Sequence, residues 1–339
     1  MKGKELLKKS SKFFLLIVLV LIAAVFEGKA FFSFFNIMNI LLSVSVYGIM
    51  ICGSIFPLLV GGMDLSVGSV AAFSGIVGVL TMSHGGFTPG SVVLGVLAAA
   101  AAGALIGILN GAITYYFDVP ALLTTISTQY IFYALAQLIT ENRTVSAVGS
   151  DIFDFIGSGT IARIPFPIFI MVGLTLIIYF VLNKTAFGRK VYAVGGNPKA
   201  SKMMGIEPGK IMIIAYILSG VTAAVAGLVL TSMNTMVRAN TGYGYELYVF
   251  IGLMIGGINF AGGEGTIQDG IFGSLLVGVL NNVLMMVGID ATYHKMVQGV
   301  VIIIAVALSA SRAAKASGLN RRTSFRRKRP AKGINSKPA

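Results

Sequence analysis

An uncharged stretch at residues 65–117 decides the fold. It reads LSVGSVAAFSGIVGVLTMSHGGFTPGSVVLGVLAAAAAGALIGILNGAITYYF, with no Asp, Glu, Lys or Arg. A transmembrane helix needs about 20 apolar residues, so this stretch is too long for one such helix and long enough for two. The turn residues SHGGFTPG at 83–90 interrupt it and predict one helix at 66–82 and another at 91–116.

Further uncharged runs lie on both sides of this pair. They predict helices at 13–26, 30–63, 119–140, 164–183, 211–237, 247–263, 270–289 and 296–311. We therefore expect an all-α membrane protein, a polytopic helical bundle with about ten transmembrane helices between residues 13 and 311. Shorter or re-entrant segments leave a count of eight or nine open. The run at 13–26 is short, so Lys12 and Lys29 would have to extend to the membrane surface.

Composition agrees with a membrane protein. Hydrophobic residues make up 56% of the 339 residues and charged residues 11%, whereas soluble domains carry about 25% charged residues. The single cysteine, Cys52, lies in an apolar run and is interpreted as a packing residue, which excludes a disulfide framework. No phosphate-binding GxxxxGK[ST] motif, catalytic triad or metal-ligand spacing is present. We expect no enzyme activity, no metal site and no bound cofactor.

Positive charge is concentrated in three segments. The formal net charge is +14, and 21 of the 26 Lys and Arg residues lie at 1–12, 184–210 and 312–339. The positive-inside rule assigns all three segments to the cytoplasm, and ten membrane crossings give the same assignment. The 312–339 tail is predicted to be disordered and to contact anionic membrane lipids. This is a simpler interpretation than nucleic-acid binding, because the tail directly follows the last predicted helix.

Glycines suggest close helix packing and an internal repeat. Gly103, Gly107 and Gly111 share one helical face, and small residues at this spacing let helices approach closely in lipid. The segment AGALIGILN at 102–110 parallels GSLLVGVLN at 273–281, an offset of 171 residues. Two inverted halves of five helices each would be a common plan for a transporter.

The candidate transport pathway is predicted from polar residues inside uncharged runs. Asp64 lies in VGGMDLSVGS at 60–69, where the glycines break a helix and Asp64 and Ser66 are good caps for the next one. The alternative is that this broken helix lines the pathway. The other candidates either bond between helices or line a path for a neutral, hydroxylated solute: Asn110, Thr124, Gln129, Asn259, Asn281 and Asn282.

Several motifs in order resemble one family. They are GMDLSVGS at 62–69, GRKVYAVGGNPKA at 188–200, GYGYE at 242–246, GGEGT at 262–266 and GVLNN at 278–282. Over about residues 30–310 the chain resembles the sugar-type permeases of ATP-binding cassette (ABC) transporters, such as the ribose, xylose and galactose importers. Met63 and the residues at 258–261 depart from that pattern, which leaves the solute open.

The resemblance implies a permease subunit in the bacterial cytoplasmic (inner) membrane, with both termini in the cytoplasm. Its partners would be an ABC ATPase subunit that uses ATP, a second permease chain, identical or paralogous, and an extracytoplasmic solute-binding protein. It would import a monosaccharide or a similar polar solute by alternating access. Nucleosides, autoinducer-like furanosyl compounds and branched-chain amino acids are alternative solutes. An ion-coupled carrier that uses Asp64 is the alternative from another class.

The basic segment 184–210 is expected to contact the ATPase subunit. We call it the coupling loop, because members of the family that the chain resembles use such a segment to transmit ATPase closure. Asn197-Pro198 after a glycine pair predicts a turn into a short helix with Pro198 at its first position. The expected coupling residues are Gly188, Arg189, Tyr192, Gly195, Gly196, Asn197, Pro198 and Lys199. The alternative is that the segment only anchors the topology through its charge.

Overall fold

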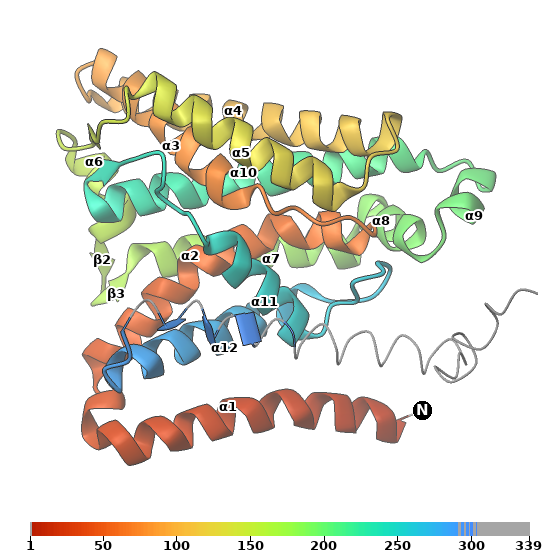
Figure 1. Ribbon diagram of the computed structural model, residues 1–339, viewed down its shortest axis with the longest axis horizontal. Helices are drawn as coiled ribbons and strands as arrows, with labels where there is room; N and C mark the ends of the chain where they lie inside the picture. Colours follow the sequence, from red (N-terminus) through yellow and green to blue (C-terminus); the bar gives the residue numbers. More distant parts are fainter. Residues whose placement is uncertain (1, 291–292, 295, 298, 301–302, 304–339) are drawn as a thin grey trace, which may run out of the picture.

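The computed structural model describes residues 2–290 together with residues 293, 294, 296, 297, 299, 300 and 303. This part of the chain is a bundle of helices that run mostly along one direction (Figure 1). The helices are α1 (Lys2–Phe31), α2 (Phe34–Leu59), α3 (Val67–His84), α4 (Pro89–Tyr116), α5 (Ala121–Ile139), α6 (Asp151–Ser158), α7 (Phe166–Lys184), α8 (Ala186–Gly196), α9 (Pro198–Met203), α10 (Pro208–Asn234), α11 (Tyr245–Gly256) and α12 (Ile267–Met286).

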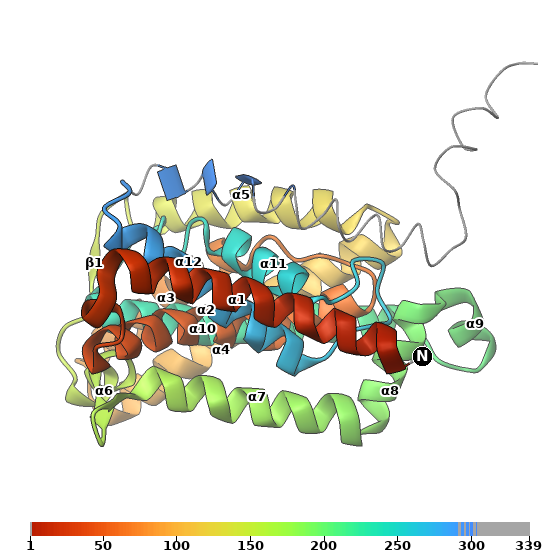
Figure 2. The ribbon, with the colours of Figure 1, turned by 90° about the horizontal axis from the view of Figure 1, so that it is seen from below.

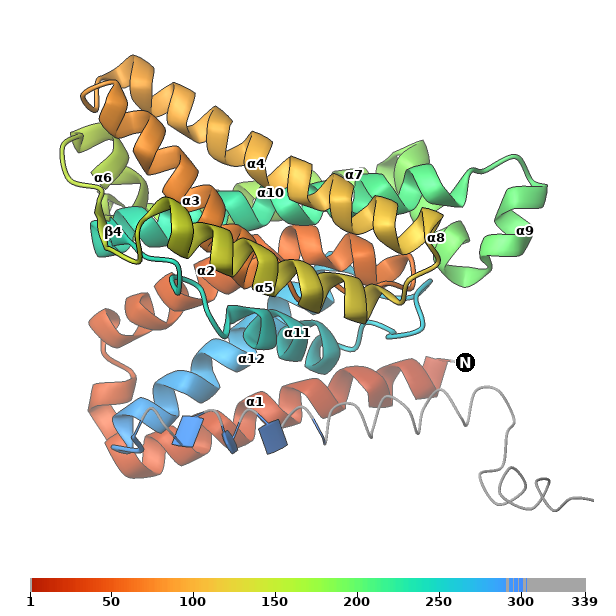
Figure 3. The ribbon, with the colours of Figure 1, turned by 45° about the horizontal axis from the view of Figure 1, so that its top comes forward.

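Two small antiparallel ribbons complete the described fold. Strand β1 (Val145–Ser146) pairs with β4 (Met236–Val237), and β2 (Thr160–Ile161) pairs with β3 (Ile164–Pro165). Both ribbons lie beside α6 at one end of the bundle, and α8 and α9 lie at the opposite end (Figures 1 and 3). We refer to these as the α6 end and the α8–α9 end.

Seven helices of the described part are long and apolar enough to cross a membrane: α2, α3, α4, α5, α7, α10 and α12. Each corresponds to a predicted span, which confirms the all-helical membrane fold. Helix α11 has only 12 residues, so it is shorter than the 247–263 run that predicted it. The predicted span at 296–311 lies largely, and the tail at 312–339 entirely, outside the described residues.

Helix α1 is longer than the uncharged run at 13–26. It extends from Lys2 to Phe31, but Gly28, with φ 49° and ψ −119°, forms a kink that divides it into two helical pieces. The long first piece therefore ends beside the charged residues at 27 and 29, close to the predicted limit at residue 26, and it begins earlier than residue 13. The N-terminus of α1 lies at the α8–α9 end (Figures 1 and 2). The basic N-terminal segment and the basic segment 184–210 thus share one end of the bundle, as the charge pattern predicts.

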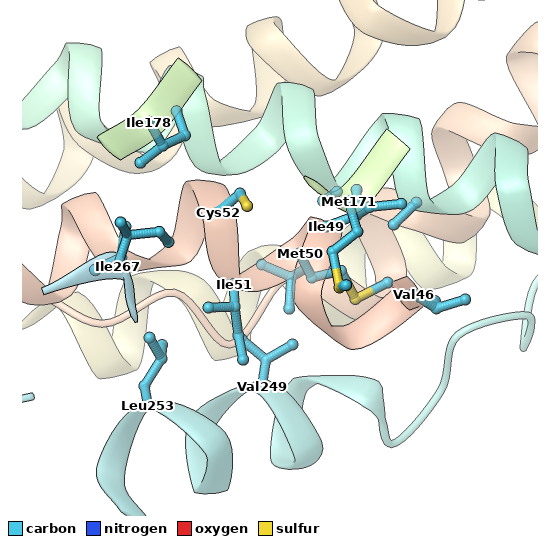
Figure 4. Packing of buried hydrophobic residues seen from close by; sticks show 14 of the residues in the cluster. Val46, Ile49, Met50, Ile51, Cys52, Met171, Ile178, Val249, Leu253 and Ile267 are labelled. Carbon is cyan, nitrogen blue, oxygen red and sulfur yellow. The ribbon is translucent and has the colours of Figure 1, made fainter. Parts of the chain in front are cut away.

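Helix α2 forms the centre of the core. Its residues between Val44 and Leu59 are buried on every side, which explains why this stretch is uncharged and mostly apolar. Figure 4 shows its side chains against residues of α7, α11 and α12. Cys52 is fully buried, and its Sγ lies 3.5 Å from Thr175 Oγ1. Its interpretation as a packing residue is confirmed.

Helices α4 and α10 approach each other through glycine, as the glycine pattern predicts. A Cβ atom at Gly103 would overlap the carbonyl of Gly220, and one at Gly107 would overlap the carbonyl of Tyr216. A Cβ at Gly111 would come within 2.7 Å of the Cα of Ile213. The two helices are therefore in backbone contact along this face.

Gly107→Ala is expected to lower the free energy of unfolding by about 1–3 kcal/mol, because the added methyl group must push α4 away from α10. Thermal unfolding of the purified chain in detergent measures the change. Gly173→Ala in α7 is the matched control, since no described residue lies within 4 Å of a Cβ there. Equal unfolding temperatures for the two variants would contradict the backbone contact.

The structure agrees with the predicted repeat. Helix α4 packs on α10, and α12 packs on α2. Gly107 meets the α10 backbone, and Gly278, which is 171 residues later, meets Val44 of α2. Helix α4 runs from the α6 end to the α8–α9 end and α12 runs the opposite way (Figure 3), so these helices are related in inverted orientation.

Candidate functional site

A break in the helical structure lies between α2 and α3. Helix α2 ends at Leu59, residues 60–66 are not helical, and α3 begins at Val67. Asp64 is only 7% exposed. Its Oδ1 accepts hydrogen bonds from Ser66 N at 3.0 Å and Ser66 Oγ at 2.6 Å, and its Oδ2 accepts one from Ser219 Oγ at 2.7 Å. The predicted helix break is therefore confirmed, and Asp64 links it to α10.

Other helices also bind this segment through polar side chains. The carbonyl of Met63 accepts from Tyr216 Oη at 3.1 Å and from Thr125 Oγ1 at 3.3 Å. Asn110 Nδ2 donates to Ser66 Oγ at 2.9 Å. Non-helical backbone inside a membrane bundle is stable only where the protein satisfies its polar groups. We call this set the Asp64 network: Met63, Asp64, Ser66, Asn110, Thr125, Tyr216 and Ser219.

The starts of α3 and α11 meet inside the bundle. A Cβ atom at Gly68 would overlap a carboxylate oxygen of Glu246 and come within 2.6 Å of the carbonyl of Gly242. Glu246 is 7% exposed, and its carboxylate accepts from Gln129 Nε2 and from Gly244 N, each at 3.1 Å. Helix N-termini carry partial positive charge, so both helix starts stabilise this carboxylate.

A cavity of about 210 Å³ lies beside this contact. That volume corresponds to about seven water molecules at about 30 Å³ each. Its walls come from α3, from α5 and from the segment between β4 and α11: Gly68, Ser69, Gln129, Tyr130, Tyr133, Ala239 and Tyr243. The cavity therefore presents hydroxyl and amide groups, set between aromatic walls, to a small polar molecule.

The structure brings some predicted pathway residues together. Asp64, Ser66 and Asn110 form one network, and Gln129 lines the cavity. Thr124 is buried in α5, and its Oγ1 has no hydrogen-bond partner among the described residues. The sequence analysis did not select Glu246, because it placed this residue at a helix end. The GYGYE motif that ends in Glu246 is the signal that marks it.

The remaining predicted pathway residues lie elsewhere. Asn282 of α12 exchanges two amide hydrogen bonds with Asn36 of α2, at 2.7 and 3.2 Å. Asn281 precedes it on α12 and is buried. Asn259 is in the turn after α11, where its Oδ1 accepts from Ala261 N at 3.0 Å. The Asn36–Asn282 pair is the interhelical bond that the sequence analysis gave as one of two alternatives.

The predicted coupling residues lie on two short helices at the α8–α9 end. Gly188, Arg189, Tyr192, Gly195 and Gly196 are on α8, which the sequence analysis did not predict as a helix. Asn197 caps α9 by accepting from Ala200 N at 3.0 Å, Pro198 is the first residue of α9, and Lys199 follows. The predicted turn into a short helix is confirmed.

Helix α8 contacts the end of α2 and the loop before α12. Gly263 N donates to the carbonyl of Leu59 at 2.8 Å, and a Cβ at Gly195 would overlap that same carbonyl. Tyr192 Oη donates to the carbonyl of Gly265 at 2.8 Å. Burial and the nearby carboxylate of Asp269 raise the pKa of Tyr192, so this phenol stays a donor. We call Leu59, Gly195 and Gly263 the backbone junction.

Comparisons with known proteins agree over most of the chain. Residues 36–306 match the family model described as "Branched-chain amino acid transport system / permease component". A ribose import permease protein of Haemophilus influenzae is 33% identical over 90% of this chain and 93% of its own length. That of Escherichia coli strain K12 is 36% identical, with coverage of 86% and 91%. An L-arabinose transport system permease protein of the same strain is 32% identical, with coverage of 85% and 88%. No solved structure matches the chain.

Proposed function

We propose that this chain, which belongs to the sugar-type family of ABC transporter permeases, is the transmembrane subunit of an ATP-driven monosaccharide importer. The observation that carries the proposal is the identity of 32–36% to permeases for ribose and L-arabinose over 85% or more of the chain. Polar side chains inside the bundle support it, because neutral donors and acceptors suit a hydroxylated solute.

The α8–α9 end faces the cytoplasm and contacts a separate ATPase subunit, which binds and hydrolyses the ATP. Two observations support this placement. Arg189, Lys199 and Lys202 are exposed at this end, as the positive-inside rule requires. Met203 and Met204 are 90% and 70% exposed, and neighbouring exposed apolar side chains at the tip of a protein mark a contact with a partner.

The α6 end faces outward and receives the solute-binding protein. A second permease chain completes the pathway, which opens alternately to the two sides. The helix break at 60–66 and the short helix α11 support such a pathway, since interrupted helices inside a bundle are typical of transport sites. Both chain termini then lie in the cytoplasm of a bacterial cell, and the protein resides in its inner membrane.

Transport by reconstituted liposomes tests the proposed function. The complex of permease, ATPase subunit and solute-binding protein is expected to accumulate at least one of D-ribose, L-arabinose and D-allose when ATP is supplied to the ATPase side. The permease chain alone is expected to accumulate none of them. Uphill uptake by the lone chain under an ion gradient would contradict the proposal and favour an ion-coupled carrier.

The family model's description gives one specific alternative solute class, the branched-chain amino acids. L-Leucine in the same assay distinguishes the two. The described cavity favours the monosaccharide, because amide and phenol groups contribute to its lining and an alkyl side chain forms no hydrogen bonds with them.

A further inference from the structure

The side chain of Gln129 is held in one orientation. Its Nε2 donates to the carboxylate of Glu246 at 3.1 Å. An ionised carboxylate only accepts hydrogen bonds, so the amide nitrogen of Gln129, and not its oxygen, must face Glu246. The amide oxygen Oε1 then faces away from Glu246.

Gln129 also forms part of the cavity wall, together with Ser69, Tyr130 and Tyr133. The Ser69 hydroxyl donates to the carbonyl of Ser66 at 2.9 Å and is thereby engaged. The rings of Tyr133 and Tyr243 lie with their centroids 6.5 Å apart and give the cavity apolar walls. The cavity therefore combines aromatic surface with one amide acceptor of fixed orientation.

We propose that this cavity is a solute-binding site in which the Gln129 Oε1 atom accepts a hydrogen bond from a hydroxyl group of the solute. Glu246 is a positioning residue, because it fixes the amide of Gln129 from behind the cavity wall. The inference rests on the proposed function and adds to it the residue that recognises the solute. The ligand class is a neutral polyhydroxylated molecule, whose hydroxyls donate to Oε1 and whose C–H faces contact the tyrosine rings.

The charge beside the cavity excludes an anionic ligand. The Glu246 carboxylate accepts a hydrogen bond from Gln129, which lines the cavity. An anionic solute in the cavity would therefore lie close to this carboxylate, and two like charges repel strongly inside a protein. An amide oxygen likewise repels an anionic oxygen, since both are acceptors. A phosphorylated sugar is therefore a poor ligand for this cavity, and its unphosphorylated form is a good one.

Import kinetics with monodeoxy analogues test the proposal. The complete complex is reconstituted with wild-type chain, and KM is measured for the best imported monosaccharide and for each of its monodeoxy analogues. At least one analogue is expected to have a KM about tenfold higher, because a site that bonds a hydroxyl rejects the analogue lacking it. In Gln129→Leu, the KM of the parent sugar is expected to rise to that of this analogue, so that their ratio falls to about one.

Two further variants separate recognition from structure. Glu246→Gln keeps the size of the side chain, but the new amide can also donate a hydrogen bond, so the Gln129 amide group can rotate by about 180°. The ratio of the analogue KM to the parent-sugar KM is therefore expected to fall partway to one. Gln268→Leu is the matched control, since Gln268 is exposed on α12 and does not line the cavity. It is expected to keep the wild-type ratio. A merely structural role of Gln129 would change KM for all analogues alike and preserve their ratios.

The two proposals fail in different ways. If the wild-type complex imports a monosaccharide and Gln129→Leu keeps every KM ratio, the recognition role is overturned and the proposed function stands. If the wild-type complex imports no monosaccharide, both are overturned. A KM ratio that falls to about one in Gln129→Leu and stays at the wild-type value in Gln268→Leu supports the assignment.

Discussion

Gly195→Ala is expected to reduce solute import by the complete complex at least tenfold, while Gly196→Ala stays close to wild type. A Cβ atom at Gly195 would overlap the carbonyl of Leu59 and come within 2.5 Å of Gly263 N. Both neighbours are backbone atoms, so no side chain can turn away to make room. The backbone junction must therefore open, and α8 loses its fixed position against the end of α2.

Helix propensity alone would favour both Gly195→Ala and Gly196→Ala, so a loss of import in only the first variant must come from its contacts. Both glycines belong to α8, and replacing a helical glycine by alanine favours the helix by about 1 kcal/mol. Within the part of the chain that the structure describes, no atom lies within 4 Å of a Cβ at Gly196, so only the favourable effect remains there. Import rate and ATP hydrolysis are measured on the same liposomes. We expect Gly195→Ala to keep ATP hydrolysis and to lose import. Wild-type import by this variant would show that the backbone junction does not couple ATP hydrolysis to solute import.

Asp64→Ala is expected to be the most destabilising substitution in the Asp64 network, at about 3 kcal/mol or more. It leaves Ser66 N, Ser66 Oγ and Ser219 Oγ without their acceptor. Each buried donor left unpaired costs about 1–3 kcal/mol. The break at 60–66 then lacks its link to α10, and we expect little folded protein in detergent.

A graded series checks this interpretation by thermal unfolding. Ser219→Ala removes one of the three bonds, and Asp64→Asn keeps one acceptor oxygen, so both should be less harmful than Asp64→Ala. An unfolding temperature of Asp64→Ala equal to that of wild type would contradict the structural role. An import activity of Asp64→Asn that has lost a dependence on an ion gradient would instead favour the carrier alternative.

The helical spans were predictable because charge marks their ends. Uncharged runs bounded by charged residues place α7, α10 and the end of α4 within a few residues of their actual limits, and the turn residues at 83–90 do the same for the start of α4. The break between α2 and α3 was predictable as well, since Gly61 and Gly62 precede Asp64 in an apolar context. Helix α8 was not, because its polar composition is also that of a charged loop.

The candidate site was predictable only in part, because burial depends on the whole fold. Gln129 and Asn110 were selected as polar residues in apolar runs. Glu246 was not selected, because a carboxylate near a predicted helix end is usually exposed. Only the folded chain shows that the end of that helix lies inside the bundle, against Gly68. Likewise, the pairing of Asn282 with Asn36 joins residues that are 246 positions apart.

The absence of a side chain at position 68 has a mechanical consequence. Gly68 lies against the carbonyl of Gly242 and a carboxylate oxygen of Glu246, so α3 presents no side chain to the start of α11 at this position. Any larger residue at position 68 would act as a wedge, and the size of this one residue therefore sets how closely the starts of α3 and α11 can approach each other.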